Sequence, residues 1–254
     1  MMDRSQQLVL YRAMLAARQA DALEHEVTSR GEAFFYVSCT GHEALAALPL
    51  HLTAADWLHC HYRDKALLIA RGIPVRAFFD NLYCKDHSSS RGRQMSGFCS
   101  DPALHVLCQS VPVGNNALQA VGVAAAVKDR ADNPLVYCGL GDGATQEGEF
   151  LEACAEAVRD ALPVLFLVQD NRYAISTSTV GRTFYSLPSG PAETLFGMPI
   201  QRVYGRDAAG LFDALGRVVQ EMRVTRKPAV VVCAVERLTS HTNADDHTDR
   251  KSVV

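Results

Sequence analysis

The sequence predicts a three-layer α/β/α fold built on a mostly parallel sheet. Three runs of consecutive apolar residues, at 135–140, 164–168 and 229–235, carry this prediction. Strands that are covered by helices on both faces show such continuous apolar runs. Stretches of helical periodicity alternate with the runs, which is typical of α/β domains. We expect residues 1–254 to form a single domain, because no change of composition marks a boundary.

The N-terminal segment, 1–55, is expected to be helical. Its first stretch has the periodicity of an amphipathic helix, and Ser5 can serve as the N-cap. Four apolar residues repeat at helical spacing in this stretch: Leu8, Tyr11, Leu15 and Ala22. After a break at Gly31, a second helix is expected from about Gly41.

The remaining elements follow in order along the chain. A short apolar piece at 57–61 precedes a helical stretch that ends at Arg71. Small side chains dominate residues 114–128, which are expected to form a helix suited to close packing against a sheet or another subunit. Two further helices are expected at 148–161 and 207–225, each shortly before an apolar run.

The composition excludes several classes of function. With 25 Lys and Arg against 28 Asp and Glu, the net charge is −3 at pH 7, which gives no footprint for nucleic-acid binding. No run of about 18 apolar residues predicts a membrane span, and the N-terminus is too charged for a signal peptide. The 8 cysteines are scattered without a Cys-x-x-Cys pair, which favours reduced thiols over disulfides or a zinc site. We therefore expect a soluble, cytoplasmic protein.

Polar residues follow two of the apolar runs at points that a parallel sheet brings together. Gly141-Asp142-Gly143 closes the first run, and Asp170-Asn171 follows the second. The interval between them, 144–169, holds a helix and a strand, so the ends of two parallel strands should come side by side. Asp142 and Asn171 would then face one point at the carboxyl edge of the sheet, where open α/β sheets bind ligands.

The ligand expected at this point is a divalent cation with a phosphate group. A carboxylate, an amide oxygen and a nearby backbone carbonyl are hard oxygen ligands, which suit Mg²⁺ that is also bound to phosphates. A diphosphate needs cations and N–H donors. The helix after the turn can supply donors, and Tyr62-Arg63 can supply a hydroxyl and a cation. On the residues alone, Arg63 can equally be a surface charge, and Gly141-Asp142-Gly143 a plain turn.

This spacing resembles that of thiamine diphosphate enzymes, in which Gly-Asp-Gly is followed by an Asn pair. Asp170 stands here in place of the first Asn. Over nearly its whole length the chain further resembles the alpha subunit of the decarboxylase component of 2-oxo acid dehydrogenases, and its Gly-Arg-Gln-Met motif is similar to the branched-chain members. The matching motifs are Leu10-Tyr11-Arg12, Gly41-His42-Glu43-Ala44, Tyr62-Arg63-Asp64, Arg91-Gly92-Arg93-Gln94-Met95, Gly141-Asp142-Gly143-Ala144, Asn171-Arg172-Tyr173-Ala174-Ile175-Ser176-Thr177 and His241-Thr242-Asn243-Ala244-Asp245-Asp246.

The resemblance implies a thiamine diphosphate-binding fold, with thiamine diphosphate and Mg²⁺ as cofactors, and it assigns roles to individual residues. Asp142, the Asn171 side chain and the Tyr173 carbonyl are expected to ligate magnesium. Tyr62 and Arg63 are expected to hold the diphosphate. The full set expected to bind the cofactor is Tyr62, Arg63, Val113, Gly141, Asp142, Gly143, Ala144, Asn171, Tyr173, Ile175 and His241.

The resemblance gives four further positions a more specific expectation. Val113 lies where the family has an apolar residue that holds the two rings of the cofactor in a bent shape. Glu147 is expected beside the metal turn. His241 is expected to be the catalytic histidine of this chain, as a hydrogen-bond donor or acid. The corresponding loop is phosphorylated in some lineages, which makes Thr242 a candidate site.

The chain departs from the family at Phe98, where members often carry a His after Gly-Arg-Gln-Met. How the substrate is handled therefore stays open. Phe98 lies in a polar segment, 86–102, that is too long for a simple connector and is expected to be functional or mobile. This segment and the His241 loop are expected to become ordered on cofactor binding, because both lack apolar anchors.

Thiamine chemistry also needs a carboxylic acid beside the aminopyrimidine. In the family this activating Glu comes from a beta subunit that carries a pyrimidine-binding domain. The resemblance therefore implies that the chain is silent alone and forms its active site at an interface, in a two-alpha, two-beta heterotetramer. A lipoyl acyltransferase is a further candidate partner.

Three functions remain open. The favoured one is decarboxylation of a 2-oxo acid, branched-chain by preference, with acyl transfer to a lipoyl group. The second is a two-component carboligase or transketolase-like enzyme without a lipoyl acceptor, which Phe98 motivates. The third is a non-catalytic homologue, against which the retention of Asp142, Asn171 and His241 argues.

Overall fold

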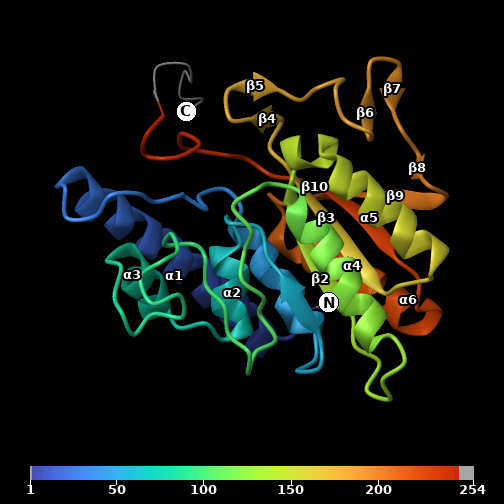
Figure 1. Cartoon of the computed structure of the whole chain (residues 1–254), viewed down its shortest axis with the longest axis horizontal. Helices are drawn as coiled ribbons and strands as arrows, with labels where there is room; N and C mark the ends of the chain where they lie inside the picture. Colours follow the sequence, from blue (N-terminus) through green and yellow to red (C-terminus); the bar gives the residue numbers. More distant parts are fainter. Residues whose placement is uncertain (1, 246–254) are drawn as a thin grey trace.

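The computed structural model describes residues 2–245, and the fold is organised around a six-stranded sheet (Figure 1). The strands lie in the order β1, β2, β3, β10, β9, β8, and all neighbours are parallel except β8 with β9. The expected fold class and the three strands expected from the apolar runs are confirmed. The bounds are Trp57–His59 (β1), Val136–Gly141 (β2), Val164–Asp170 (β3), Thr194–Leu195 (β8), Met198–Tyr204 (β9) and Ala229–Ala234 (β10).

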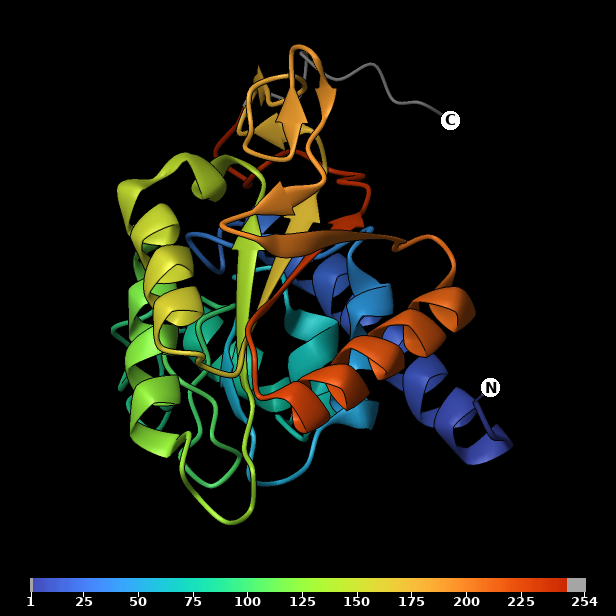
Figure 2. The same cartoon turned by 90° about the vertical axis from the view of Figure 1, so that its right-hand side faces the viewer.

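Helices cover both faces of this sheet, as Figure 2 shows. One face carries α4 (Asn115–Val127) and α5 (Gly148–Arg159). The other face carries α6, α2, α1 and a 3₁₀ helix, η1, while α3 packs beside α1. Their bounds are Ala208–Thr225 (α6), Lys65–Arg71 (α2), Arg4–Ser29 (α1), Glu43–His51 (η1) and Val75–Leu82 (α3).

Strand β3 shows why the apolar runs are continuous. Leu165 and Leu167 belong to the core cluster on the α1 and α6 side, whereas Phe166 and Val168 belong to the cluster on the α4 and α5 side. Successive side chains of a strand point to opposite faces. Because both faces of β3 are buried, every position in the strand is apolar until its carboxyl end.

Helix α1 begins and packs differently from the expectation. Its N-cap is Asp3 rather than Ser5, because the Asp3 carboxylate accepts from the Gln6 N–H at 2.8 Å and the Gln6 side chain accepts from the Asp3 N–H at 3.0 Å. The four apolar residues at helical spacing, Leu8, Tyr11, Leu15 and Ala22, are exposed. The buried residues are instead Leu10, Ala13, Ala17, Ala20, Asp21, Glu24 and Val27.

Close packing of small side chains and a cluster of buried ion pairs determine which face of α1 is buried. Three alanines let the helix backbone approach its neighbours. Lys65, from α2, forms ion pairs with Asp21 and, at 2.7 Å, with Glu24, and all three side chains are almost fully buried. Periodicity of apolar residues could not reveal this face, because charged residues form part of it.

The second helix expected near Gly41 is the 3₁₀ helix η1. Pro49 lies within it and has no N–H to donate to an α-helical hydrogen bond. Its residues from Glu43 to Pro49 are all buried between α1, α2 and α6.

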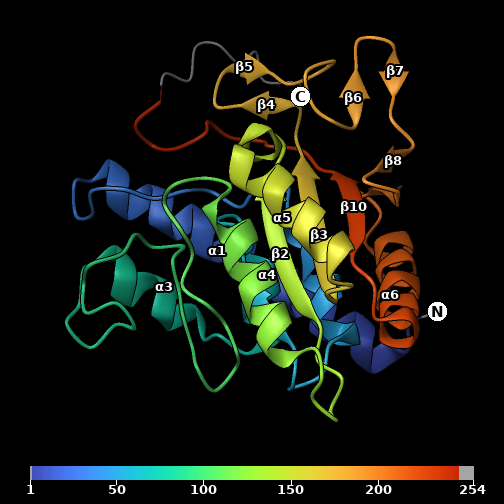
Figure 3. The same ribbon diagram turned by 45° about the vertical axis from the view of Figure 1, so that its right-hand side comes forward.

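Between β3 and β9 the chain leaves the sheet and forms short hairpins above its carboxyl edge, at the top of Figure 3. These are β4 (Tyr173–Ala174) with β5 (Thr177–Ser178), and β6 (Ser186–Leu187) with β7 (Gly190–Pro191). In the described part of the chain, no helix combines the length and apolar character needed to cross a membrane. All eight cysteines are free thiols.

Candidate active site

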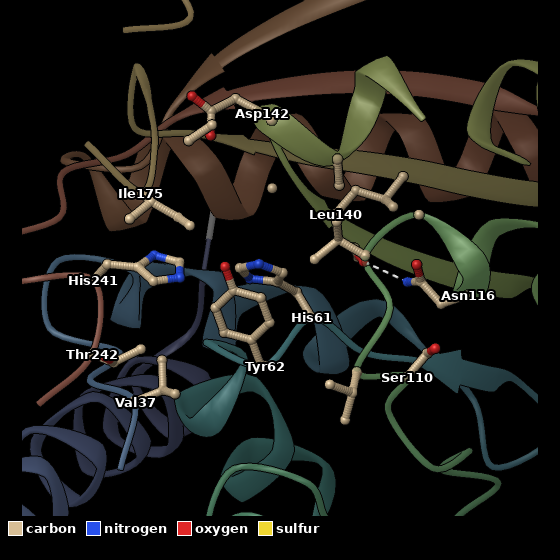
Figure 4. A pocket seen from close by; sticks show the side chains of 18 of the residues that line it. Val37, His61, Tyr62, Ser110, Asn116, Leu140, Asp142, Ile175, His241 and Thr242 are labelled. Atoms are coloured by element: carbon tan, nitrogen blue, oxygen red, sulfur yellow. Dashed lines mark hydrogen bonds between the residues drawn. The ribbon is translucent and has the colours of Figure 1, made fainter. Parts of the chain in front are cut away.

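A cavity of about 350 Å³ lies at the carboxyl ends of β1, β2 and β3. All the residues expected to bind the cofactor line it except Arg63. Parallel pairing explains this convergence, since Gly141 at the end of β2 pairs with Gln169 at the end of β3. The lining residues that carry the argument below are His61, Tyr62, Phe98, Asp142, Asn171 and His241, several of which are labelled in Figure 4.

The turn after β2 holds a buried carboxylate at the edge of the cavity. Asp142 is 2% exposed, and its Oδ2 accepts a hydrogen bond from the Thr179 hydroxyl at 2.6 Å. Burial raises the pKa of Asp142, and the nearby carboxylate of Asp170 raises it further, although the Thr179 bond opposes both. Burial also raises the pKa of Asp170. A cation bound here would offset the cost of these two buried charges.

The turn after β3 places two more oxygens beside the same cavity. The Asn171 side chain is 9% exposed, and its Oδ1 accepts from the Tyr173 N–H at 3.2 Å. Tyr173 opens hairpin β4–β5, whose Ala174 packs against the turn after β2. A Cβ on Gly143 would lie 2.5 Å from the Ala174 Cβ, so only glycine at 143 allows this approach.

The donor set of Asp142, Asn171 and the Tyr173 carbonyl fits Mg²⁺ that keeps phosphate or water ligands. It provides one carboxylate, one amide oxygen and one carbonyl oxygen, which are the hard ligands that this ion prefers. Among residues 2–245, no group of three or more His, Cys, Asp or Glu side chains could hold a metal. The three ligands proposed from the protein would leave the other positions of an octahedral Mg²⁺ to phosphate or water oxygens.

Arg63 lies behind the cavity and not in its wall. It is 1% exposed, and its guanidinium donates to the carbonyl oxygens of Ser38 at 2.6 Å and His241 at 2.9 Å. Its Nε has no hydrogen-bond partner among the described residues. This arrangement does not show the direct contact with a diphosphate that the resemblance implies. Arg63 instead holds the His241 loop in place through its hydrogen bonds.

His241 is held at one side of the cavity by two arginines. The Nη2 of Arg63 lies 3.0 Å from its Nδ1, and the Nη1 of Arg237 lies 3.4 Å from the same atom. Because a guanidinium can only donate, Nδ1 accepts and the neutral ring carries its proton on Nε2. The ring faces Tyr62 edge-on, with centroids 6.1 Å apart (Figure 4).

The loop that carries His241 is anchored to the segment after α1. The Asn243 side chain accepts from the Tyr36 N–H at 3.0 Å and donates to the Phe34 carbonyl at 3.2 Å. The Thr242 hydroxyl donates to the Asp245 carboxylate at 2.7 Å. Asp246, the last residue of the motif, lies outside the described residues.

The segment 86–102 has apolar anchors, contrary to the expectation. Phe98 and Cys99 are buried, and Met95 and Phe98 form part of the cavity wall. Gly97 lies so close to the Tyr62 carbonyl that a Cβ would be 2.8 Å from its oxygen. The segment therefore packs on the candidate site through an apolar surface, at the position where the resemblance implies a His.

Val113 and Glu147 lie together at the mouth of the cavity. Val113 is 46% exposed, and Glu147 is the N-cap residue of α5. Gly114 separates them with a φ of +84°, and a Cβ there would lie 2.7 Å from the Glu147 Cβ. A side chain at 114 would thus be strained by both backbone and contact.

Several lining residues were not expected from the sequence. Asn116 donates to the Gly139 carbonyl at 2.8 Å (dashed in Figure 4) and fixes the start of α4 against β2. Arg237 donates to the Ile175 carbonyl at 2.6 Å and so ties the β4–β5 hairpin to the His241 loop. His61 lies on the cavity floor. The only available signal was that Arg237 and His61 each follow a strand at its carboxyl end.

A mostly parallel sheet with helices on both faces and a cavity at its carboxyl edge defines a ligand-binding α/β protein of the open-sheet type. The comparisons with known proteins narrow this class. The chain belongs to the dehydrogenase E1 component family, whose model matches residues 11–253. The resemblance expected from the motifs is confirmed.

The relatives are alpha subunits of branched-chain dehydrogenases. The chain is 32% identical over 247 residues to the 3-methyl-2-oxobutanoate dehydrogenase subunit alpha of Mycobacterium tuberculosis. This alignment covers 96% of this chain and 64% of that protein. It is 29% identical over 241 residues to the 2-oxoisovalerate dehydrogenase subunit alpha of Bacillus subtilis, which covers 93% of this chain and 72% of that protein. It thus spans about two thirds of the length of these relatives.

A solved structure shares the fold. The transketolase of Campylobacter jejuni superposes with a TM-score of 0.62 at 19% identity, over 92% of this chain and 38% of that one. At this identity the likeness shows the architecture alone.

Proposed function

We propose that this chain is the alpha subunit of a thiamine diphosphate-dependent 2-oxo acid dehydrogenase that decarboxylates branched-chain 2-oxo acids and transfers the acyl group to a lipoyl group. The observation that carries the proposal is the convergence of Asp142, Asn171 and Tyr173 on one cavity in a chain of this family. The relatives named above act on 2-oxoisovalerate, also called 3-methyl-2-oxobutanoate, which supports the branched-chain substrate.

In this proposal the carboxyl edge holds the diphosphate end of the cofactor. Asp142, Asn171 and the Tyr173 carbonyl would hold Mg²⁺, and N–H groups of the turn at Gly143 and Ala144 would face the phosphates. Tyr62 offers a hydroxyl in the cavity, and Val113 at its mouth offers an apolar surface for the rings. Thiamine diphosphate, when bound, supplies the electron sink for the carbanion that decarboxylation generates.

His241 has the geometry of a hydrogen-bond donor or acid. Because its Nδ1 accepts from Arg63, the neutral ring carries its proton on Nε2, and we propose that this N–H acts on a bound molecule. Arg63 and Arg237 fix both the ring orientation and the tautomer. These two residues therefore position His241, and their positive charges also favour anions nearby.

The mouth of the cavity supports the need for a partner. Three apolar residues around it are about half exposed: Val111, Val113 and Ile175. Water would cover them in the isolated chain, which is unfavourable, and a second polypeptide would bury them. We propose a beta subunit with a pyrimidine-binding domain and the activating Glu, in a two-alpha, two-beta assembly that serves a lipoyl acyltransferase.

The test is decarboxylation of 2-oxoisovalerate by the chain together with its beta partner, with thiamine diphosphate and Mg²⁺. Activity should require both chains and be abolished by a chelator or by Asp142→Ala. Asp129→Ala, which removes an exposed carboxylate that does not line the cavity, is the matched control. Absence of decarboxylation by the assembled protein would refute the proposal.

The second candidate function is that of a carboligase without a lipoyl acceptor, which the apolar Phe98 in the cavity wall supports. Analysis of the reaction products distinguishes it from the dehydrogenase. Acyl transfer to lipoamide supports the dehydrogenase. An acyloin or ketol formed without lipoamide would instead identify a carboligase with the same cofactor.

A further inference from the structure

The cavity floor contains an imidazole that the proposed function does not yet use. His61 lies two residues after the end of β1 and is 7% exposed, and it lines the cavity between Tyr62 and the end of β2 (Figure 4). A methyl group added to Gly141 would lie 3.3 Å from the His61 Nε2 and 3.9 Å from its Cε1. The Nε2 edge of the ring is therefore next to the turn that carries Asp142.

The backbone and the ring of His61 are both held in place. Its N–H donates to the Asp64 carboxylate at 2.7 Å, and that carboxylate also accepts from the Tyr137 hydroxyl at 2.9 Å and from the Gln169 amide. The ring packs against the Tyr62 ring with centroids 3.9 Å apart and an angle of 41° between the ring planes. A side chain fixed in this way loses little conformational freedom when a ligand arrives.

The hydrogen bonds of the ring determine which nitrogen carries the proton. The Arg63 N–H points to Nδ1 at 3.4 Å, so Nδ1 accepts and Nε2 carries the hydrogen. The amide oxygen of Gln169 also faces this ring, but it already accepts from the His42 Nδ1 at 2.6 Å. The Nε2–H therefore shares this amide oxygen with His42 at most, and the oxygen of an incoming anion can replace it as the acceptor.

The ring stays neutral under ordinary conditions. Burial lowers the pKa of His61 well below its usual value, and the positive charge of Arg63 lowers it further. A neutral donor can bind an oxyanion without adding a buried charge to a cavity floor that already has Arg63 behind it. This is the state in which an imidazole can face a diphosphate across the physiological range.

We infer that His61 is a cofactor-binding residue, which donates its Nε2–H to an oxygen of the diphosphate held above the Gly141-Asp142-Gly143 turn. The inference rests on the proposed function, because the ligand is the diphosphate of that same site. It explains why glycine stands at 141, since a larger residue would cover the Nε2 edge.

The first test is binding by calorimetry, with the full chain and magnesium pyrophosphate as the probe. His61→Leu removes the donor and should weaken binding by roughly 10- to 100-fold, the range for a hydrogen bond to a charged group. His61→Gln keeps an amide N–H near the Nε2 position and should recover most of the affinity. His59→Gln is the matched control, because His59 is also buried but bonds to Gln119 and does not line the cavity.

The second test needs no variant and so does not depend on whether His61→Leu folds. Nitrogen-15 spectra of the histidine rings in the wild-type chain should show His61 as the neutral Nε2–H form, and magnesium pyrophosphate should shift its Nε2–H signal. If the wild-type chain binds pyrophosphate but this signal does not move and His61→Leu binds equally well, the inference is overturned while the proposed function stands. If the wild-type chain binds no magnesium pyrophosphate, the inference is overturned, whereas the proposed function is decided by the decarboxylation assay on the assembled protein.

Discussion

Replacing Gly143 by Ala should damage the metal site through one contact. The backbone of Gly143 is not in the left-handed region, so alanine can adopt its conformation. The new methyl group, however, would lie 2.5 Å from the Ala174 Cβ and 3.3 Å from its Cα. Two carbon atoms prefer to be about 3.5–4.0 Å apart. The turn after β2 and hairpin β4–β5 would therefore have to separate by about 1 Å.

That displacement is large compared with what a metal site tolerates. Ligand distances in such sites are held within about 0.2 Å, and Mg²⁺ requires near-ideal octahedral geometry. Asp142 lies on one side of the contact, and Asn171 and Tyr173 lie on the other. We expect the affinity for magnesium pyrophosphate to fall about 10- to 100-fold, as when the groups that hold a metal's ligands are disturbed. Overpacking should also lower the free energy of unfolding by about 1–3 kcal/mol.

The assay is calorimetric titration with magnesium pyrophosphate, together with urea unfolding. Ala174→Gly in the Gly143→Ala background removes the Cβ that is struck and should restore most of both losses. The matched control is Gly148→Ala at the start of α5, where no atom lies within 4 Å of the new methyl group; it should bind normally and be no less stable. Normal binding and stability of Gly143→Ala, or failure of the second substitution to restore them, would show that this contact does not set the site.

Two further predictions concern buried ionisable side chains. Burial, and then the charge of Arg63, lowers the pKa of His42 to about 3 from 6.5, so its stabilising effect is complete above pH 6.5 and is lost as the pH falls toward 3. Between pH 7 and pH 5 the wild type should lose about 2 kcal/mol more stability in urea than His42→Asn, and equal losses would contradict the assignment. Arg223→Met should destabilise the fold by about 3 kcal/mol, because Asp56, 1% exposed, is left without its cation. Since this pair lies at the amino end of the sheet, pyrophosphate binding at a temperature where the variant is folded should be unchanged, and weakened binding would argue against that separation.

The sequence predicted the sheet and the convergence of the turns after β2 and β3 well, for a local reason. A strand buried on both faces must be apolar at every position, so β2, β3 and β10 are visible as continuous runs. The place where each run stops is equally local. Polar residues at that point mark the carboxyl edge, and parallel pairing then requires Asp142 and Asn171 to approach the same cavity.

The errors lie where packing between distant segments decides the outcome. The buried face of α1 contains Asp21 and Glu24, which are buried only because Lys65 from α2 reaches them. Periodicity alone favoured the exposed Leu8 and Tyr11. The polar segment 86–102 looked unanchored, because its few apolar residues are buried only by contacts with the cavity wall, which is formed by distant parts of the chain.

By itself, the sequence determined the class of fold and the positions of the apolar runs that become strands. It also contained the motifs of the family and the residues that a magnesium diphosphate would require. Only the tertiary structure decided that Arg63 supports His241 from behind the cavity, that Phe98 closes its wall and that His61 forms its floor. The physical reason is that the spacing of apolar residues and the short motifs are properties of residues that are close together in the sequence. Which side chain reaches a cavity depends on backbones that approach from opposite ends of the chain.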